Sequence, residues 1–225
     1  MSKTVTYEPD TIRENLSPDK TSKKLVINYL TLRKYIGILG IALPVSLVAG
    51  LAILNNSIDL IQDSISSYYY TEMRNLFVGI LVAVGVFLLT YKGYEKKDNI
   101  LSGLAGFFAF LIAFIPTSST DSLQETLHLL SAAAFFFILA YFSYFLFTKS
   151  NKSILSPQKI RRNTIYRICA IVMVCSILSI PIFLALLDEA YYQLNLTFWL
   201  ETIALWAFGF SWLTKGEAIF ADIVS

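Results

Sequence analysis

Long apolar segments recur six times along this chain, separated by short polar connections. They cover residues 35–55, 76–92, 100–117, 125–148, 165–187 and 196–214. A helix needs about 20 mostly apolar residues to cross a hydrocarbon layer of roughly 30 Å. The strands of a membrane barrel would alternate in polarity over about ten residues, and the run from Leu76 to Leu89 does not alternate. The pattern therefore predicts an all-α membrane bundle of six transmembrane helices.

The connections divide the six helices into three hairpins, each formed by two consecutive segments, whose tips all lie on one side of the membrane. The transmembrane domain covers residues 35–216. A polar tail precedes it at residues 1–34, in which the stretch 25–34 is expected to form a short interfacial helix, and a short tail follows at residues 217–225. We expect no cleavable signal, because residues 1–24 lack an apolar stretch of 7–15 residues.

Composition supports a membrane location. Hydrophobic residues make up 56% of the 225 residues and the mean hydropathy is +0.60, whereas soluble domains hold roughly 45–50% apolar residues. The chain has no GxxxxGK[ST] phosphate loop, no GxSxG elbow, no HExxH and no GxGxxG. A nucleic-acid partner is not expected.

Positive charge predicts the orientation. Of the 18 Lys and Arg residues, all but Arg74 fall on the side that carries both termini. Basic residues collect on the cytoplasmic side of membrane proteins, so we expect a multi-pass protein of the cell inner membrane with both termini in the cytoplasm.

Acidic residues gather on the opposite side. Eight of the 16 carboxylates lie in the outer tips or just inside the helices that follow. With Arg74, that side carries a net charge of about −7, a field that would attract cations. The eight are Asp59, Asp63, Glu72, Asp121, Glu125, Asp188, Glu189 and Glu201.

Small residues predict the closest helix contact. Ser102, Gly106, Ala109 and Ala113 form one stripe on segment 100–117, and segment 125–148 carries Ser131 followed by three alanines. Small residues let membrane helices approach closely. We expect these two segments to form the tightest pair.

The main candidate site lies at the start of segment 125–148. Asp121, Glu125 and His128 are spaced i, i+4 and i+7, which places two carboxylates and the single histidine of the chain on one helical face. Within the membrane an ionisable side chain needs a partner or water, so this face could move protons or hold a divalent cation; no other cofactor is indicated. The alternative is that His128 is a packing residue bonded to Ser66, Ser67 or a tyrosine of the first tip.

Glu201 is the second intramembrane candidate, because apolar residues surround it about one turn into segment 196–214. If Glu72, Glu125 and Glu201 face inward, carboxylates from three hairpins converge on one outward-facing pocket. The expected lid or rim of that pocket consists of Ser66, Ser67, Tyr68, Tyr69, Tyr70 and Arg74.

The stretches ISSYYYTEMRNLFVGILVAVGVFLLTYKGYEKKDNILSGLAGFFA, LHLLSAAAFF and FWLETIALWAFGFSWLTKG resemble an uncharacterised family of small six-helix bacterial inner-membrane proteins. This resemblance covers residues 30–216 and implies no particular activity. A more distant likeness is to the alkaline ceramidase type of membrane hydrolase, which implies a zinc ion held by three histidines beside a Ser and an Asp. Ser66 or Ser67, Asp121 and His128 would take those parts, but the paired histidines near the C-terminus are absent.

Three functions follow from these features. The leading hypothesis is a protein that binds or senses a small polar or cationic ligand, or a lipid headgroup, in the acidic outer pocket. The alternatives are a metal-assisted intramembrane lipid hydrolase and a proton-coupled transporter of small solutes. A transporter would need polar residues to continue to the cytoplasmic face, where three of the segments are almost wholly apolar. Membrane lipids and a small molecule are the expected partners, and homo-oligomerisation is left open.

Overall fold

The computed structural model describes residues 18–54, 59–93, 95–117, 120–150, 154–187, 190 and 193–220. This described part is all-α and contains no strand, which confirms the all-α part of the predicted fold. Its elements are α1 (Pro18–Leu54), η1 (Ser66–Tyr70), α2 (Arg74–Thr90), α3 (Lys96–Phe114), α4 (Ser122–Tyr141), η2 (Phe142–Leu146), α5 (Pro157–Leu187) and α7 (Leu196–Lys215). The first short element is a 3₁₀ turn, and the second is a π-helical extension of α4.

Five of the described helices are long and apolar enough to cross a membrane, as in a multi-pass membrane protein. The exception is α2, an apolar helix of 17 residues. α1 runs without a break over 37 residues, so residues 25–34 belong to the same helix as the apolar stretch Tyr29–Leu54.

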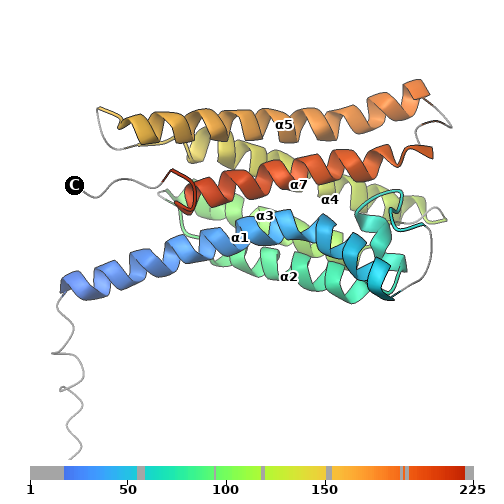
Figure 1. Cartoon of the computed structure of the whole chain (residues 1–225), viewed down its shortest axis with the longest axis horizontal. Helices are drawn as coiled ribbons and strands as arrows, with labels where there is room; N and C mark the ends of the chain where they lie inside the picture. Colours follow the sequence, from blue (N-terminus) through green and yellow to red (C-terminus); the bar gives the residue numbers. More distant parts are fainter. Residues whose placement is uncertain are drawn as a thin grey trace, which may run out of the picture.

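Figure 1 shows the α-helices running along one bundle, and within the described residues each of the six contacts two neighbours, so that together they form a ring. In this ring α1 lies between α2 and α7, α5 lies between α7 and α4, and α3 joins α4 to α2. The start of α1 and the end of α7 lie at one end of the bundle, here called the terminal end. η1 and the starts of α2, α4 and α7 lie at the opposite end, here called the η1 end (Figure 1). The tips of the three predicted hairpins therefore lie together.

The stripe of small residues on α3 is buried, but its main partner is α2. Ser102 donates a hydrogen bond to the Leu88 carbonyl oxygen of α2. A Cβ atom on Gly106 would lie 2.7 Å from the Gly85 carbonyl oxygen, and one on Gly85 would lie 3.1 Å from the Gly106 carbonyl oxygen. The predicted tightest pairing of α3 with α4 is wrong, because the glycine on each of α2 and α3 brings those two backbones closer.

A second glycine pair joins the first and last helices. A Cβ atom on Gly37 of α1 would lie 2.8 Å from the Gly209 carbonyl oxygen of α7, and the reverse distance is 2.6 Å. Because α7 can approach so closely, α1 packs more extensively on α7 than on α2, its predicted hairpin partner.

Aromatic side chains fill the core toward the terminal end. The fully buried Trp212 indole lies 5.2 Å from the Tyr91 ring and 5.2 Å from the Phe147 ring, in edge-to-face contacts. Such contacts hold large rings in a fixed geometry. Buried polar side chains occur at both ends of the bundle, among them Ser66 and His128 at the η1 end.

Candidate functional site

The segment that includes η1 lies against the start of α7. The Asp63 carbonyl oxygen accepts a hydrogen bond from the Phe198 amide at 3.1 Å. The carboxylate of Glu201 accepts a hydrogen bond from the Ile65 amide, with Oε2 2.7 Å from the nitrogen. These bonds use donors and acceptors that would otherwise be costly to bury, so Glu201 fixes the beginning of η1 against α7.

His128 fixes the next residue of the same segment against α4. Its ring is 2% exposed, and its Nε2 lies 2.9 Å from Oγ of Ser66, which is 7% exposed. Its Nδ1 lies 2.6 Å from the Ile115 carbonyl oxygen, just after α3 ends. The alternative interpretation of the sequence, in which His128 bonds to a hydroxyl of the first tip, matches this geometry.

The two partners of His128 define how its ring is protonated. A carbonyl oxygen only accepts, so Nδ1 carries a hydrogen. In the neutral ring Nε2 then has a lone pair, and the hydroxyl of Ser66 donates to it. This arrangement makes Nε2 a base within reach of a serine hydroxyl, with the ring oriented by a third group.

Asp121 and Glu125 are not the hydrogen-bond partners of His128 in this arrangement. Asp121 is the exposed N-cap of α4, and its Oδ1 accepts hydrogen bonds from the Leu123 and Gln124 amides at 3.0 and 3.1 Å. Glu125 is half-buried in the first turn of α4.

The described donor groups at the η1 end are not arranged around a common metal position. Among the described residues, no group of three or more His, Cys, Asp and Glu side chains lies together as metal ligands would. Both nitrogens of His128 have protein partners, and the carboxylate of Asp121 caps its own helix. We therefore derive no chemistry from a divalent cation on Asp121, Glu125 and His128.

The three tyrosines of η1, which the sequence places in the rim of the pocket, differ in their contacts. Tyr70 donates a hydrogen bond to the Thr117 carbonyl oxygen beyond α3. The guanidinium of Arg74 lies over the Tyr69 ring, with its central carbon 4.1 Å from the ring centroid, and also donates to the Tyr69 hydroxyl oxygen. Tyr68 is buried and donates to the Leu60 carbonyl oxygen at 2.6 Å. Burial raises the pKa of Tyr68 above its usual value.

Ser67 of the predicted rim and the acidic residues of the first tip are not the partners that His128 bonds to, which are Ser66 and Ile115. The hydroxyl of Ser67 lies 2.8 Å from that of Ser64. Glu72 is exposed, as are Asp59 and Asp63, which keeps acidic groups at the surface of the η1 end. Asp188 and Glu189, expected in the same acidic group, lie outside the described residues.

A hollow of about 440 Å³ opens beside the Arg74–Tyr69 pair, between α2 and α3. Polar side chains line it near the start of α2, and apolar side chains line the rest. The lining residues are Tyr69, Arg74, Asn75, Val78, Gly79, Val82, Ala113 and Phe114.

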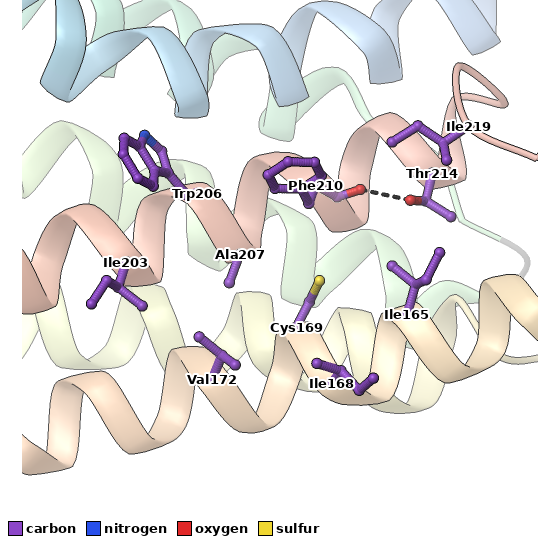
Figure 2. A pocket seen from close by; sticks show the side chains of 10 residues that line it. All are labelled: Ile165, Ile168, Cys169, Val172, Ile203, Trp206, Ala207, Phe210, Thr214 and Ile219. Carbon is purple, nitrogen blue, oxygen red and sulfur yellow. Dashed lines mark hydrogen bonds between the residues drawn. The ribbon is translucent and has the colours of Figure 1, made fainter.

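Figure 2 shows a second hollow, of about 410 Å³, between α5 and α7. Its lining is almost wholly apolar, and the hydroxyl of Thr214 donates to the Phe210 carbonyl oxygen within the same helix at 2.8 Å. A similar apolar hollow of about 380 Å³ lies between α4 and α5. Neither includes a residue of the predicted site, and neither presents a group of reactive side chains.

Basic residues at the terminal end are more buried than the sequence indicates. Arg162 and Lys215 are both buried. The Phe147 carbonyl oxygen, just beyond η2, accepts hydrogen bonds from Lys159 Nζ at 2.8 Å and from Lys215 Nζ at 3.5 Å. Cations stabilise the carbonyl end of a helix, which gives these lysines a structural role that charge counting alone does not identify.

The residues missed by sequence reasoning are mostly backbone partners. Ile65 and Ile115 complete the bonds of Glu201 and His128 through an amide and a carbonyl group, which leave no trace in side-chain patterns. The sequence matches no protein-family model and no curated protein, and no solved structure matches the chain.

Proposed function

We propose that this chain is a six-span protein of a bacterial inner membrane, with the terminal end in the cytoplasm and the η1 end outside. The distribution of basic residues supports this orientation. The apolar α2 supports a sixth crossing, although its 17 residues are at the short limit for a span. The resemblance to small six-helix bacterial membrane proteins is part of the same proposal.

This orientation has a direct test. Cys169 and Cys175 would be replaced by serine, and single cysteines would be placed at two exposed positions, Glu72 of the η1 end and Arg161 of the terminal end. A thiol reagent that does not cross membranes should label the cysteine at position 72 in intact cells and the one at 161 only after lysis. The opposite pattern would overturn the orientation.

We propose further that the protein binds or senses a small polar ligand or a lipid headgroup at the η1 end. The observation that carries this proposal is the hollow of about 440 Å³ lined by Tyr69 and Arg74, whose guanidinium favours a ligand with an anionic or polar group over a cationic one. Ligand sites are typically concave and mostly apolar, with a few polar groups that fix orientation. Glu201 and His128 hold the segment that supplies Tyr69, so they support the site without having to contact the ligand.

Purified protein in detergent would be titrated with choline, phosphocholine, ethanolamine and glycerol 3-phosphate, and its thermal unfolding followed. A ligand that binds only the folded protein raises the unfolding temperature. We expect at least one compound to stabilise the protein, with the effect reduced in Arg74→Gln or Tyr69→Phe and retained in Arg161→Gln, a control at the terminal end. Equal stabilisation of all variants would place binding elsewhere.

A second candidate function is acyl transfer by Ser66, which the contacts of His128 favour. In this reaction Ser66 Oγ attacks an ester carbonyl and its proton passes to His128 Nε2. The imidazolium then protonates the departing alcohol, and water, deprotonated by the same nitrogen, releases the acid and regenerates Ser66. The Ile115 carbonyl oxygen would hold the Nδ1–H in place, the part an orienting carboxylate plays in a hydrolase triad.

An alkyl fluorophosphonate, which forms a covalent bond with activated serines, would test this candidate. Labelling of the wild type and Ser67→Ala but not of Ser66→Ala or His128→Gln is the expected result. Absence of labelling in wild-type protein reconstituted in phospholipid vesicles would remove the acyl-transfer candidate and leave the binding proposal intact.

A further inference from the structure

Arg74 is the basic residue that membrane orientation does not explain. The other 17 Lys and Arg residues fall on the side assigned to the cytoplasm, whereas Arg74 lies at the η1 end. A translocated loop tends to lack Lys and Arg. The presence of Arg74 at the η1 end therefore needs another explanation.

The position of Arg74 within its helix is also unusual. Arg74 is the first residue of α2, where the helix dipole is positive and acidic side chains are preferred. The first turn of α2 contains no acidic residue, and the N-cap Met73 provides no side-chain hydrogen bond. Glu72 precedes the helix but does not line the hollow beside it. A guanidinium and the positive end of a helix therefore coincide, which is the environment that binds phosphate groups.

The hollow beside Arg74 is polar near the start of α2 and apolar farther along the helix. Arg74 and Asn75 occupy the first turn of α2, and Val78 and Val82 follow on the same face, one and two turns deeper. At 1.5 Å of rise per residue, Val82 lies about 12 Å along the helix from Arg74. This sequence of environments matches a phosphate group followed by a hydrocarbon chain.

Two glycines on α2 differ in their surroundings. At Gly85 a Cβ atom would lie 2.9 Å from the Phe110 ring and 3.1 Å from the Gly106 carbonyl oxygen, so α2 and α3 are in close contact there. At Gly79, nearer the η1 end, no heavy atom lies within 4 Å of a Cβ position. Gly85 therefore lies in the contact between α2 and α3, whereas Gly79, on a different face of α2, lines the hollow and borders open space. The hollow is called the wedge below.

From these observations we infer that the wedge binds a glycerophospholipid of the outer leaflet. Arg74 and the first turn of α2 bind its phosphate, and one acyl chain lies along Val78, Gly79 and Val82. Arg suits this part because its planar fork can bond two phosphate oxygens at once, and Tyr69 holds the fork in place. The inference rests on the proposed ligand site at the η1 end and names its ligand class.

The decisive experiment compares two leucine variants. Gly79→Leu places a side chain in the wedge, while Gly103→Leu on α3 is a matched control, because its Cβ position is equally open and it does not line the hollow. Delipidated protein in detergent would be titrated with phosphatidylglycerol, diacylglycerol and glycerol 3-phosphate. We expect Gly79→Leu to weaken phosphatidylglycerol binding by about tenfold or more and Gly103→Leu to leave it unchanged.

The variant Arg74→Gln tests the contribution of the phosphate to binding separately from that of the acyl chain. It should reduce binding of phosphatidylglycerol to the level of diacylglycerol, which lacks the phosphate, while Arg74→Lys should retain part of the preference. If Gly79→Leu does not fold, Gly79→Ala places a smaller side chain at the same position. Because a methyl group obstructs less, its effect would be measured on the binding of diacylglycerol, which binds more weakly and should be lost first.

The possible outcomes distinguish this inference from the broader proposal. Binding of glycerol 3-phosphate as tight as that of phosphatidylglycerol, sensitive to Arg74→Gln but not to Gly79→Leu, would overturn the lipid inference and keep a headgroup site. Unchanged phosphatidylglycerol binding in both Gly79→Leu and Arg74→Gln would overturn the wedge as its site. Absence of binding by all three compounds, together with the amines tested above, would remove both.

Discussion

Ser66 Oγ lies 2.9 Å from Nε2 of His128, a residue 62 positions later in the chain. The preceding residue, Ile65, donates its amide to the carboxylate of Glu201. Two consecutive residues at the start of η1 are thus bonded to two different helices, α4 and α7. This double attachment fixes the segment that carries Tyr69 and makes the geometry of the hollow depend on residues that do not line it.

Replacing His128 should destabilise the η1 end. His128→Ala leaves the Ser66 hydroxyl and the Ile115 carbonyl oxygen without their partner, at a cost of about 1–3 kcal/mol for an unsatisfied buried group. Unfolding by SDS in mixed micelles would measure the loss. The control is Gln124→Ala, which removes a single bond from α4 to the Pro116 carbonyl oxygen, 2.8 Å long, and should cost less. Equal stability of His128→Ala and wild type would contradict a structural role for the ring.

Replacing Glu201 should loosen the same segment from its other side. Glu201→Gln keeps an oxygen that can accept from the Ile65 amide, whereas Glu201→Leu leaves that amide without an acceptor. Limited proteolysis from the η1 end should cut the segment 59–73 faster in Glu201→Leu than in Glu201→Gln, with Gln close to wild type. If both variants were cut at the wild-type rate, the Glu201–Ile65 bond would not hold the segment.

The contact between α2 and α3 predicts a strong position effect. A side chain on Gly106 would meet the Gly85 carbonyl oxygen and Leu89 of α2, while one on Gly103 would meet no heavy atom within 4 Å. Overpacking costs about 1–3 kcal/mol or more, so Gly106→Leu should lower the unfolding temperature in detergent and Gly103→Leu should not. A similar loss in both variants would indicate that α2 and α3 do not approach at Gly106.

Hydropathy predicted the apolar segments well because a bilayer imposes both length and polarity on each crossing. α7 begins at Leu196, the predicted position, whereas α2, the short helix, ends two residues before the predicted segment does. Pairing was harder to predict. Several helices carry small residues, and which of them meet is decided by the rotation of each helix in the ring, which its own sequence does not encode.

The candidate site was likewise predictable from the sequence only in part. The spacing of Asp121, Glu125 and His128 correctly put Glu125 and His128 on one helix, with Asp121 as its N-cap, but it did not give the three residues a shared role. Asp121 directly precedes the first turn of α4, a position where a carboxylate commonly caps the backbone, and this preference was already visible in the sequence. The Ile115 carbonyl group was not predictable, because every residue has one and only the folded chain selects it.

Tyr68 should make stability depend on pH in the alkaline range. Burial raises its pKa in the folded protein above the usual value of 10.0, so the unfolded chain loses this proton at a lower pH than the folded chain. The contribution of Tyr68 to stability is therefore complete below about pH 10 and is lost as the pH rises through the folded pKa.

Thermal unfolding of wild type and Tyr68→Phe would be compared between pH 8 and pH 11. Tyr68→Phe should be less stable at pH 8, because the Leu60 carbonyl oxygen loses its donor, and the difference should shrink toward pH 11. A constant difference across this range would show that Tyr68 ionises at the same pH in the folded and unfolded chains.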